Sequence, residues 1–550
     1  MRLVGKRNIC AANPRYERFE DGEREKVAPD MRKEFAAQPA TDASSVTARR
    51  AVINPLWQGL LGSVLITLGS FGVGWLASVS PMNRNALLIA IRTEYSGVIA
   101  STVVMTVGCW ILFRGWLRLG QVHAGWGPGS LKAVKKAVWI WSAPMLVALP
   151  IFSRDVFAYI GQGRLVDAGQ DPYVTGISSL NNWFQLGTDI TWAQDETPYG
   201  PLFLLLEYWV FRAVGSSPDL SVLLFRLIAF VGVILCLIYV PKLAALHKVS
   251  GAKAAWITVA NPLFLISFVA SAHNDAIMVG LAVAATYYAA TRRGILAVVL
   301  ITASVGIKPI TMVLLPFIGL LWAGTSANWP RKILYWCYTL ALFAAIMLAV
   351  GLVNGYGIGW LKVMLGTGTG SVIFAPVGAL NALLSGLFDA FSLPTNWILP
   401  VLKFGGRLLS VALVLVLIFK GKPSHLVQRM ALAFTALVVL SPIVQPWYLL
   451  WLLPFFAATG IRDDWQIVWV YFTTAFFIAF GAADQLFIWQ FLGELDPWVK
   501  HLSTGISWAA MFYLAYLDPR TRRLFIGLVP SKKWLKVFRS RPNKDGVASS

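Results

Sequence analysis

The sequence predicts an all-α membrane protein, a polytopic helical bundle of about 13 to 15 transmembrane helices with interfacial helices on its outer side. Composition gives the first reason, because 57% of the 550 residues are hydrophobic and only 13% are charged, which is too apolar for a soluble chain of this length. The second reason is the recurrence of apolar segments of about 17 to 25 residues, each long enough to cross a hydrocarbon core of about 30 Å. Open strands are excluded because their backbone groups would stay unpaired in lipid.

The net charge of +21 indicates membrane orientation rather than nucleic-acid binding, because Lys and Arg lie mainly between the apolar segments and in the two tails. The cysteines, Cys10, Cys109, Cys236 and Cys337, show no CxxC spacing and no nearby histidine pair, so neither a zinc site nor a disulfide framework is expected. No metal and no cofactor is predicted, since the sequence has no HExxH motif, no spaced carboxylate set and no Gly-rich nucleotide loop.

Three parts are expected along the chain. Residues 1–54 are polar and predict a disordered cytoplasmic tail without a secretory signal, in which Met31 is an alternative start to Met1. Residues 55–518 form the transmembrane catalytic domain. Residues 519–550 are strongly basic, which suits a cytoplasmic tail facing an anionic inner leaflet.

The first three spans set the predicted orientation, and they are expected at residues 58–79, 98–119 and 134–152. The loop between the second and third is basic, which places it in the cytoplasm. Residues 153–200 then form the first long extracytoplasmic loop, where function is expected because loops on a rigid scaffold often carry chemistry.

Two short apolar segments, 201–213 and 376–391, are expected to lie at the membrane interface. This arrangement keeps the later basic loops inside and gives about 14 full crossings. A full crossing at 201–213 would instead place Lys242 and Lys248 outside.

An acid and a base follow the third span directly, in Ser153-Arg154-Asp155. Asp155 is a candidate general base, because a carboxylate within hydrogen-bond reach of an acceptor hydroxyl can take its proton. The structural alternative is a helix cap, in which Ser153 or Asp155 accepts from first-turn amides while Arg154 reaches toward the water boundary. The sequence leaves both interpretations open.

Further polar groups interrupt later apolar segments, in Ser271-Ala272-His273-Asn274-Asp275 and at Lys308. Charged groups between spans are costly, which makes them candidates for function. Lys308 could stabilise a phosphate as a point charge. The alternatives are a polar turn joining two helices for the first segment and a lysine that reaches the lipid headgroups for the second.

Aromatic residues gather at Gln445-Pro446-Trp447-Tyr448 and at Tyr173 and Tyr199. The first group could form a wall on which a sugar stacks, or it could belong to the aromatic belt of the membrane. The two tyrosines fit interfacial anchoring.

The order of these motifs resembles the C-type glycosyltransferase superfamily, whose multi-span members use polyprenyl-phosphate sugars. More closely, the chain from about Pro55 to Asp518 resembles the polyprenol-phosphate-mannose-dependent α-1,6-mannopyranosyltransferases of mycobacteria and corynebacteria, with a likeness to glycosyltransferase family 87. The motifs that carry the resemblance are Ser153–Tyr159, Gly169–Tyr173, Tyr199–Leu202, Ala272–Asp275 and Gln445–Tyr448. Each is short, so the specificity rests on their order and spacing.

The resemblance implies the C-type glycosyltransferase fold and a multi-pass enzyme of the plasma membrane with an extracytoplasmic active site. It implies mannose transfer from polyprenyl-phosphate-mannose to a phosphatidylinositol-mannoside, which extends the α-1,6-mannan core of lipomannan and lipoarabinomannan. Of the two related enzymes that share this work, the early, core-forming one is favoured.

A single displacement with inversion follows from a β-linked donor and an α-linked product, as the resemblance implies. Asp155 would be the base, and Arg154, His273 and Lys308 would hold the phosphate, because fixed positive charge stabilises the charge that develops in the transition state. Asn274 and Asp275 would orient mannose hydroxyls. The other predicted substrate-binding residues are Tyr159, Tyr199, Gln445, Trp447 and Tyr448.

Two alternatives remain at this stage. One is a flippase or transporter for a lipid-linked sugar, which is disfavoured because the candidate charges are expected at one face and no matching broken helices occur in two halves. The other is a C-type transferase of different linkage, α-1,2-mannosyl or arabinosyl.

Overall fold

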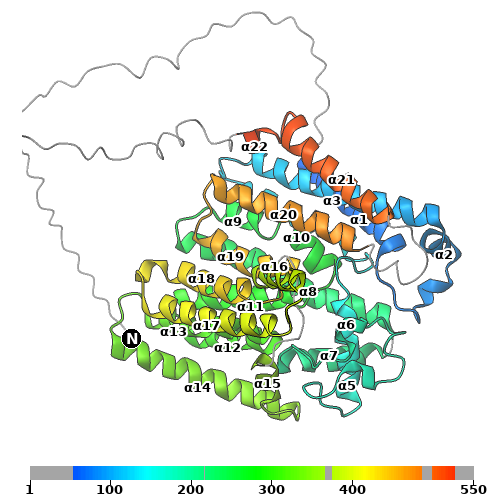
Figure 1. Cartoon of the computed structure of the whole chain (residues 1–550). Coiled ribbons are helices and arrows are strands. Elements are labelled where there is room, and N and C mark those ends of the chain that lie inside the picture. Colours follow the sequence, from blue (N-terminus) through cyan, green and yellow to red (C-terminus); the bar gives the residue numbers. More distant parts are fainter. Residues whose placement is uncertain (1–53, 216, 366–374, 486–497, 527–550) are drawn as a thin grey trace, which may run out of the picture. The chain divides into compact units, whose positions relative to one another are not determined.

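The computed structural model describes residues 54–215, 217–365, 375–485 and 498–526 (Figure 1). The predicted N-terminal tail lies outside the described residues except for Asn54, and the predicted C-terminal tail is described only as far as residue 526. Helices and connecting loops make up everything that is described, and no strand occurs within these ranges. The predicted all-α class is therefore confirmed.

Six helices of the described chain are long and apolar enough to cross a membrane. They are α1 (Pro55–Val73), α3 (Tyr95–Val122), α8 (Pro218–Leu246), α14 (Trp329–Val353), α17 (Ile398–Phe419) and α20 (Trp465–Asp484). A seventh candidate is a broken span in which α9 (Gly251–Ile257) and the helical segment Pro262–Ala270 meet at 62°. These helices identify a polytopic membrane protein.

Seven other helices or helix pairs of the described chain fall below the length of the six long helices. They are α4 (Ser130–Met145), α11 (Asp275–Ala290), α12 (Gly294–Ile307), the η4–α13 pair (Pro309–Ala323), α18 (Leu426–Val439), the η6–α19 pair (Pro446–Thr459) and α21 (Trp498–Phe512). A helix of 16 residues is about 24 Å long, which is less than a hydrocarbon core of about 30 Å. The predicted number of full crossings, about 14, is therefore larger than the number of long apolar helices in the described chain, which is six. Apolar composition continues through breaks in the helices, so short helices look like full spans in the sequence.

The predicted spans match helices with shifted ends. The third span was expected to continue to residue 152, but α4 ends at Met145, one residue after Pro144 inside its last turn, where proline disrupts helical hydrogen bonding. The two segments expected at the interface are the helices α7 (Pro201–Val214) and α16 (Pro376–Ala390). Each begins with proline, whose missing N–H costs nothing at the first helical position.

Close packing of α1 on α3 depends on small residues. A Cβ atom on Gly62 would meet the backbone of Leu112 and Gly108, and one on Gly108 would meet the backbone of Ile66 and Gly62. Such contacts let two membrane helices approach through their backbones, which replaces the hydrophobic driving force that lipid cannot supply.

The helices that position the candidate site meet at their ends. Helix α5 (Asp155–Asp167) packs against α7, and α11 packs against both α8 and α12, as Figure 1 shows for this part of the chain. Four breaks between helices carry the polar residues singled out above: Ser153–Asp155, Ser271–Asp275, Lys308 and Gln445–Tyr448.

Candidate active site

Asp155 opens helix α5 at the edge of a polar cluster. The chain reaches it through Phe152, whose φ of 65° is left-handed, and the backbone N–H of Asp155 donates to Ser153 Oγ at 3.2 Å. The Asp155 side chain is 18% exposed, which makes it the most exposed of the charged side chains in the cluster. The helix-cap interpretation is met in part, since Ser153 Oγ does accept from a first-turn amide.

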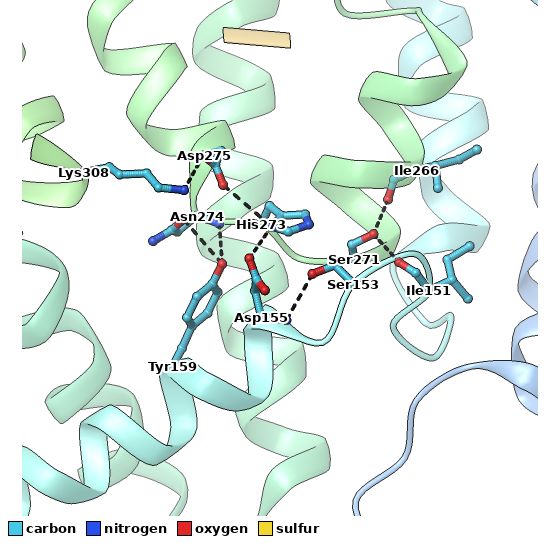
Figure 2. A network of polar contacts seen from close by, with 10 residues as sticks. All are labelled: Ile151, Ser153, Asp155, Tyr159, Ile266, Ser271, His273, Asn274, Asp275 and Lys308. Carbon is cyan, nitrogen blue, oxygen red and sulfur yellow. Dashed lines mark hydrogen bonds and ion pairs between the residues drawn. The ribbon is translucent and has the colours of Figure 1, made fainter. Parts of the chain in front are cut away.

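His273 lies between two carboxylates. Its Nδ1 atom is 3.6 Å from Asp155 Oδ2 and 3.7 Å from Asp275 Oδ2, although the three residues come from two segments far apart in the sequence (Figure 2). The His273 side chain is 1% exposed and that of Asp275 is fully buried. Burial of this kind requires compensating partners for the charges.

Lys308 supplies the compensating cation. Its Nζ atom donates to Asp275 Oδ1 at 2.8 Å, and the same ammonium lies 5.0 Å from the ring centroid of Trp451, 5.6 Å from that of Tyr448 and 5.7 Å from that of Tyr199. Aromatic faces attract a cation within about 6 Å. Lys308 is therefore held inside the protein by one carboxylate and three rings.

Tyr159 connects helix α5 to the segment that carries His273. Its hydroxyl accepts from the backbone N–H of Asn274 at 3.3 Å and lies 3.4 Å from Asn274 Oδ1 (Figure 2). The Tyr159 ring packs edge-on against Tyr199 with centroids 5.3 Å apart. Asn274 Nδ2 has no hydrogen-bond partner among the described residues, which leaves a buried donor available to a ligand.

An aromatic wall closes the other side of the cluster. Trp447 lies over His273, with ring centroids 4.1 Å apart, and Tyr448 stacks on Trp451 at 3.8 Å. The indole Nε1 atoms of Trp447 and Trp451 find no hydrogen-bond partner in the part of the chain that is described. Gln445 contributes to the turn through its carbonyl, which accepts from the N–H of Tyr448 at 2.9 Å.

Arg154 was predicted to hold a phosphate together with Lys308, but its guanidinium contacts other residues. Its guanidinium donates to Asp189 at 3.3 Å and to the carbonyl of Gly187 at 3.0 Å, and it lies 4.1 Å from the centroid of the Trp75 ring. Asp189 and Gly187 lie in the loop region after α5 and Trp75 lies just after α1, so these contacts are separate from His273 and Lys308. The structure thus gathers nine of the eleven predicted site residues around His273 and Lys308. Arg154 turns to other partners, and the contact of Gln445 is the backbone bond to Tyr448 in its own turn.

The electrostatics of the cluster shift three side chains. Burial raises the pKa of Asp155, and the charges of His273 and Lys308 oppose that shift. Burial lowers the pKa of His273 against the pull of the two carboxylates. Burial also lowers the pKa of Lys308, but Asp275, Tyr448 and Asp155 together outweigh burial, and the net shift is upward. A base that is easily protonated thus stands near a firmly charged ammonium.

The arrangement can remove a proton from a hydroxyl and stabilise a developing anion. Asp155 is the accessible base, and the ammonium of Lys308 is a preorganised positive charge in a largely dry site. No group of three or more His, Cys, Asp or Glu side chains in the described ranges is placed to hold a metal ion. Trp451 was not predicted, since a tryptophan within an apolar helix carries no signal of its own in the sequence.

Comparison with known proteins finds two family models that match long parts of the chain. The model of the "Alpha-(1->6)-mannopyranosyltransferase, N-terminal domain" matches residues 56–324, which include Asp155, His273, Asp275 and Lys308. The model of the "MptB C-terminal domain" matches residues 374–493. No solved structure matches the chain.

Individual relatives are similar over most of their length. "Alpha-(1->6)-mannopyranosyltransferase A" of Mycobacterium tuberculosis is 28% identical over 410 residues, 72% of this chain and 78% of the relative. "Probable alpha-(1->6)-mannopyranosyltransferase" of Mycolicibacterium smegmatis is 28% identical over 472 residues, 78% of this chain and 82% of the relative. "Alpha-(1->6)-mannopyranosyltransferase B" of Corynebacterium glutamicum is 24% identical over 461 residues, 76% and 75% of the two chains. Two family models that together cover most of the bundle, and relatives aligned along it, show that the chain belongs to the alpha-(1->6)-mannopyranosyltransferase family of glycosyltransferases.

Proposed function

We propose that this mannosyltransferase takes its sugar from polyprenyl-phosphate-mannose and transfers it to the growing α-1,6-mannan of a phosphatidylinositol-mannoside, the core of lipomannan and lipoarabinomannan. The observation that carries the proposal is the cluster itself. The partly exposed carboxylate of Asp155 lies next to His273, and the ammonium of Lys308 is held nearby by Asp275 and the ring of Trp451. A base and a phosphate-binding cation are the two groups that such a displacement needs.

The reaction is a single displacement at the anomeric carbon. The oxygen of the acceptor 6-hydroxyl forms a bond to C1 of mannose while the bond from C1 to the carrier phosphate breaks, and the phosphate keeps the electron pair. Asp155 accepts the hydroxyl proton. The departing phosphate needs no general acid, because it is already a weak base, and Lys308 stabilises its charge together with His273.

Sugar recognition falls to the buried donors and the aromatic wall. Asn274 Nδ2 and the Nε1 atoms of Trp447 and Trp451 are unpaired within the described chain, and buried polar atoms normally find a partner. Mannose hydroxyls are suitable acceptors for these three groups. The flat faces of Trp447 and Tyr448 suit the apolar face of a pyranose ring.

An extracytoplasmic location is supported by the alternation of site segments and basic loops. Helix α4 separates the basic loop after α3 from Asp155, α11 separates Asp275 from Arg292 and Arg293, and α12 separates those arginines from Lys308. Basic loops favour the cytoplasmic side. The site then opens outside the plasma membrane, where nucleotide sugars are absent and a lipid-bound donor is required.

The test is mannose transfer by purified protein in nanodiscs, from polyprenyl-phosphate-mannose to a short α-1,6-mannoside. We expect Asp155→Asn to lower kcat by at least about 100-fold, because the amide cannot accept the proton. Asp167→Asn is the matched control, since Asp167 ends the same helix and forms an exposed pair with Arg212. This control should keep wild-type turnover.

The outcomes separate the parts of the proposal. Transfer by the wild type and the control, but not by Asp155→Asn, supports the donor and the base together. Full activity of a folded Asp155→Asn protein would remove Asp155 from the chemistry. Transfer from a soluble nucleotide sugar, with none from the lipid-linked one, would overturn the donor.

A further inference from the structure

Arg226 is a buried arginine of α8 that the reaction described above does not use. It is 3% exposed, and its guanidinium donates three hydrogen bonds to backbone carbonyls. Nε donates to Val269 O at 2.9 Å, Nη2 to Ala270 O at 2.8 Å and Nη1 to Leu146 O at 3.0 Å. The guanidinium is a rigid, planar group, so three such bonds fix the carbonyls relative to one another.

The three carbonyls belong to the two segments that lead into the site. Val269 and Ala270 end the helical segment directly before Ser271–Asp275, and Leu146 is the residue that follows α4, on the way to Asp155. No single secondary-structure element carries both Asp155 and His273. Their 3.6 Å contact therefore depends on what joins the two segments.

A further contact joins the same two segments directly, since Ser271 Oγ donates to Ile151 O at 2.5 Å and lies 3.1 Å from Ile266 O (Figure 2). The segment of Asp155 is also tied to the end of α20, because Gln485 Oε1 accepts from the N–H of Phe152 at 2.6 Å. Phe152 and Ala272 both have left-handed φ values, 65° and 59°. Non-glycine residues keep such conformations only where surrounding contacts hold them, and they gather at functional sites.

We propose that Arg226 is a positioning residue for mannose transfer, which holds the segments of Asp155 and His273 together so that base and phosphate-binding groups act on one substrate. This inference rests on the proposed function. Arg226 does not touch the sugar; it acts through the backbone carbonyls that it binds. A displacement of about 1 Å at a catalytic group can cost about 100-fold in rate.

The chain offers a matched control in Arg429 of α18. Arg429 is also buried, and it also donates from Nε, Nη1 and Nη2 to three carbonyls, those of Leu417, Gly421 and Ile418, at 2.8, 3.3 and 2.8 Å. Those carbonyls lie at the end of α17 and in the turn after it. Loss of Arg429 thus removes a similar set of hydrogen bonds without touching the segments of Asp155 and His273.

The experiment compares Arg226→Met, Arg226→Lys and Arg429→Met in nanodiscs, with kcat and KM measured for the lipid-linked donor and the mannoside acceptor. We expect Arg226→Met to lower kcat by about 10- to 100-fold, with both KM values within about twofold of wild type. Arg226→Lys should recover part of kcat, because an ammonium can still donate to two carbonyls. Arg429→Met should keep kcat per folded molecule.

An equal kcat for the two folded Met variants would overturn the positioning role while leaving the mannosyltransferase proposal intact. Absence of transfer by the wild type itself would overturn both. If Arg226→Met does not fold, Arg226→Gln tests the same role, since its amide can donate to at most two of the three carbonyls, with Arg429→Gln as its control. A selective loss of kcat in Arg226→Gln supports the proposal, and equal kcat in the two Gln variants refutes it.

Discussion

Burial and neighbouring charges shift the pKa of Asp155 in opposite directions, so the pH dependence of the rate tests whether Asp155 is the base. Burial raises the pKa of Asp155, and the ionised form is the one that can accept a proton. The rate should therefore fall as the pH decreases through a value above the usual aspartate pKa of about 3.9. The measurement is kcat/KM against pH, whose acidic limb reports the free enzyme.

Two neighbours should move this acidic limb in opposite directions. The charge of Lys308 lowers the pKa of Asp155 and that of Asp275 raises it. Lys308→Met should shift the limb to higher pH and Asp275→Asn should shift it to lower pH, in each case beside any loss of maximal rate. Shifts of the same sign in both variants would show that another group controls the limb.

The charged residues of the site could be singled out from the sequence, while their contacts could not. Asp155, His273 and Lys308 attract notice because charges between apolar segments are costly unless they are paired or used. Arg154 was grouped with Asp155 by adjacency, but successive residues at the start of a helix diverge by about 100°, and Arg154 turns to Asp189. The catalytic and binding roles of all these residues stay predictions.

At the scale of elements, the packing of α5 on α7 supports the helix that Asp155 opens. Gly163 faces α7 so closely that a Cβ atom would meet the carbonyl of Glu207. We expect Gly163→Ala to force the two helices apart, at a cost of about 1 to 3 kcal/mol. The expected result is a lower Tm in detergent together with a lower kcat.

A glycine with open space around it provides the comparison for Gly163. Gly386 lies in α16, and a Cβ atom there would meet nothing within 4 Å. Gly386→Ala should leave Tm unchanged or raise it slightly, because alanine favours a helix by up to about 1 kcal/mol. A Tm for Gly163→Ala equal to that of Gly386→Ala would contradict the tight packing.

Element types could be predicted from the sequence more fully than element ends. Long apolar runs identified α1, α3 and the helices that follow, and the prolines at 201 and 376 marked the starts of α7 and α16. The breaks were harder, because the run expected as a span at 134–152 stays apolar past Met145, where α4 ends. Hydropathy averages over such a break, whereas the backbone geometry changes at a single residue.

At the scale of the whole described chain, loops that carry site residues alternate with loops rich in Lys and Arg. Segments with site residues and segments rich in Lys and Arg are separated by one helix each time along α11, α12 and α13. Lys253 also pairs with Asp463 at 2.8 Å and donates to Ile461 O at 2.8 Å, which joins the loop before α20 to the basic region at the start of α9. This pattern supports one active face and one basic face.

The orientation of these faces can be measured with two serine-to-cysteine variants in a background whose native cysteines are replaced. Ser178 is exposed in the loop after α5, and Ser326 is exposed between α13 and α14. A membrane-impermeant maleimide added to intact cells should label Ser178→Cys at once and Ser326→Cys only after permeabilisation, because the basic loops favour the cytoplasm. Both variants should keep mannose transfer, which confirms that the labelled protein is folded. The reverse labelling pattern would put Asp155 on the cytoplasmic side, where nucleotide sugars are available, and would remove the main reason for a lipid-linked donor.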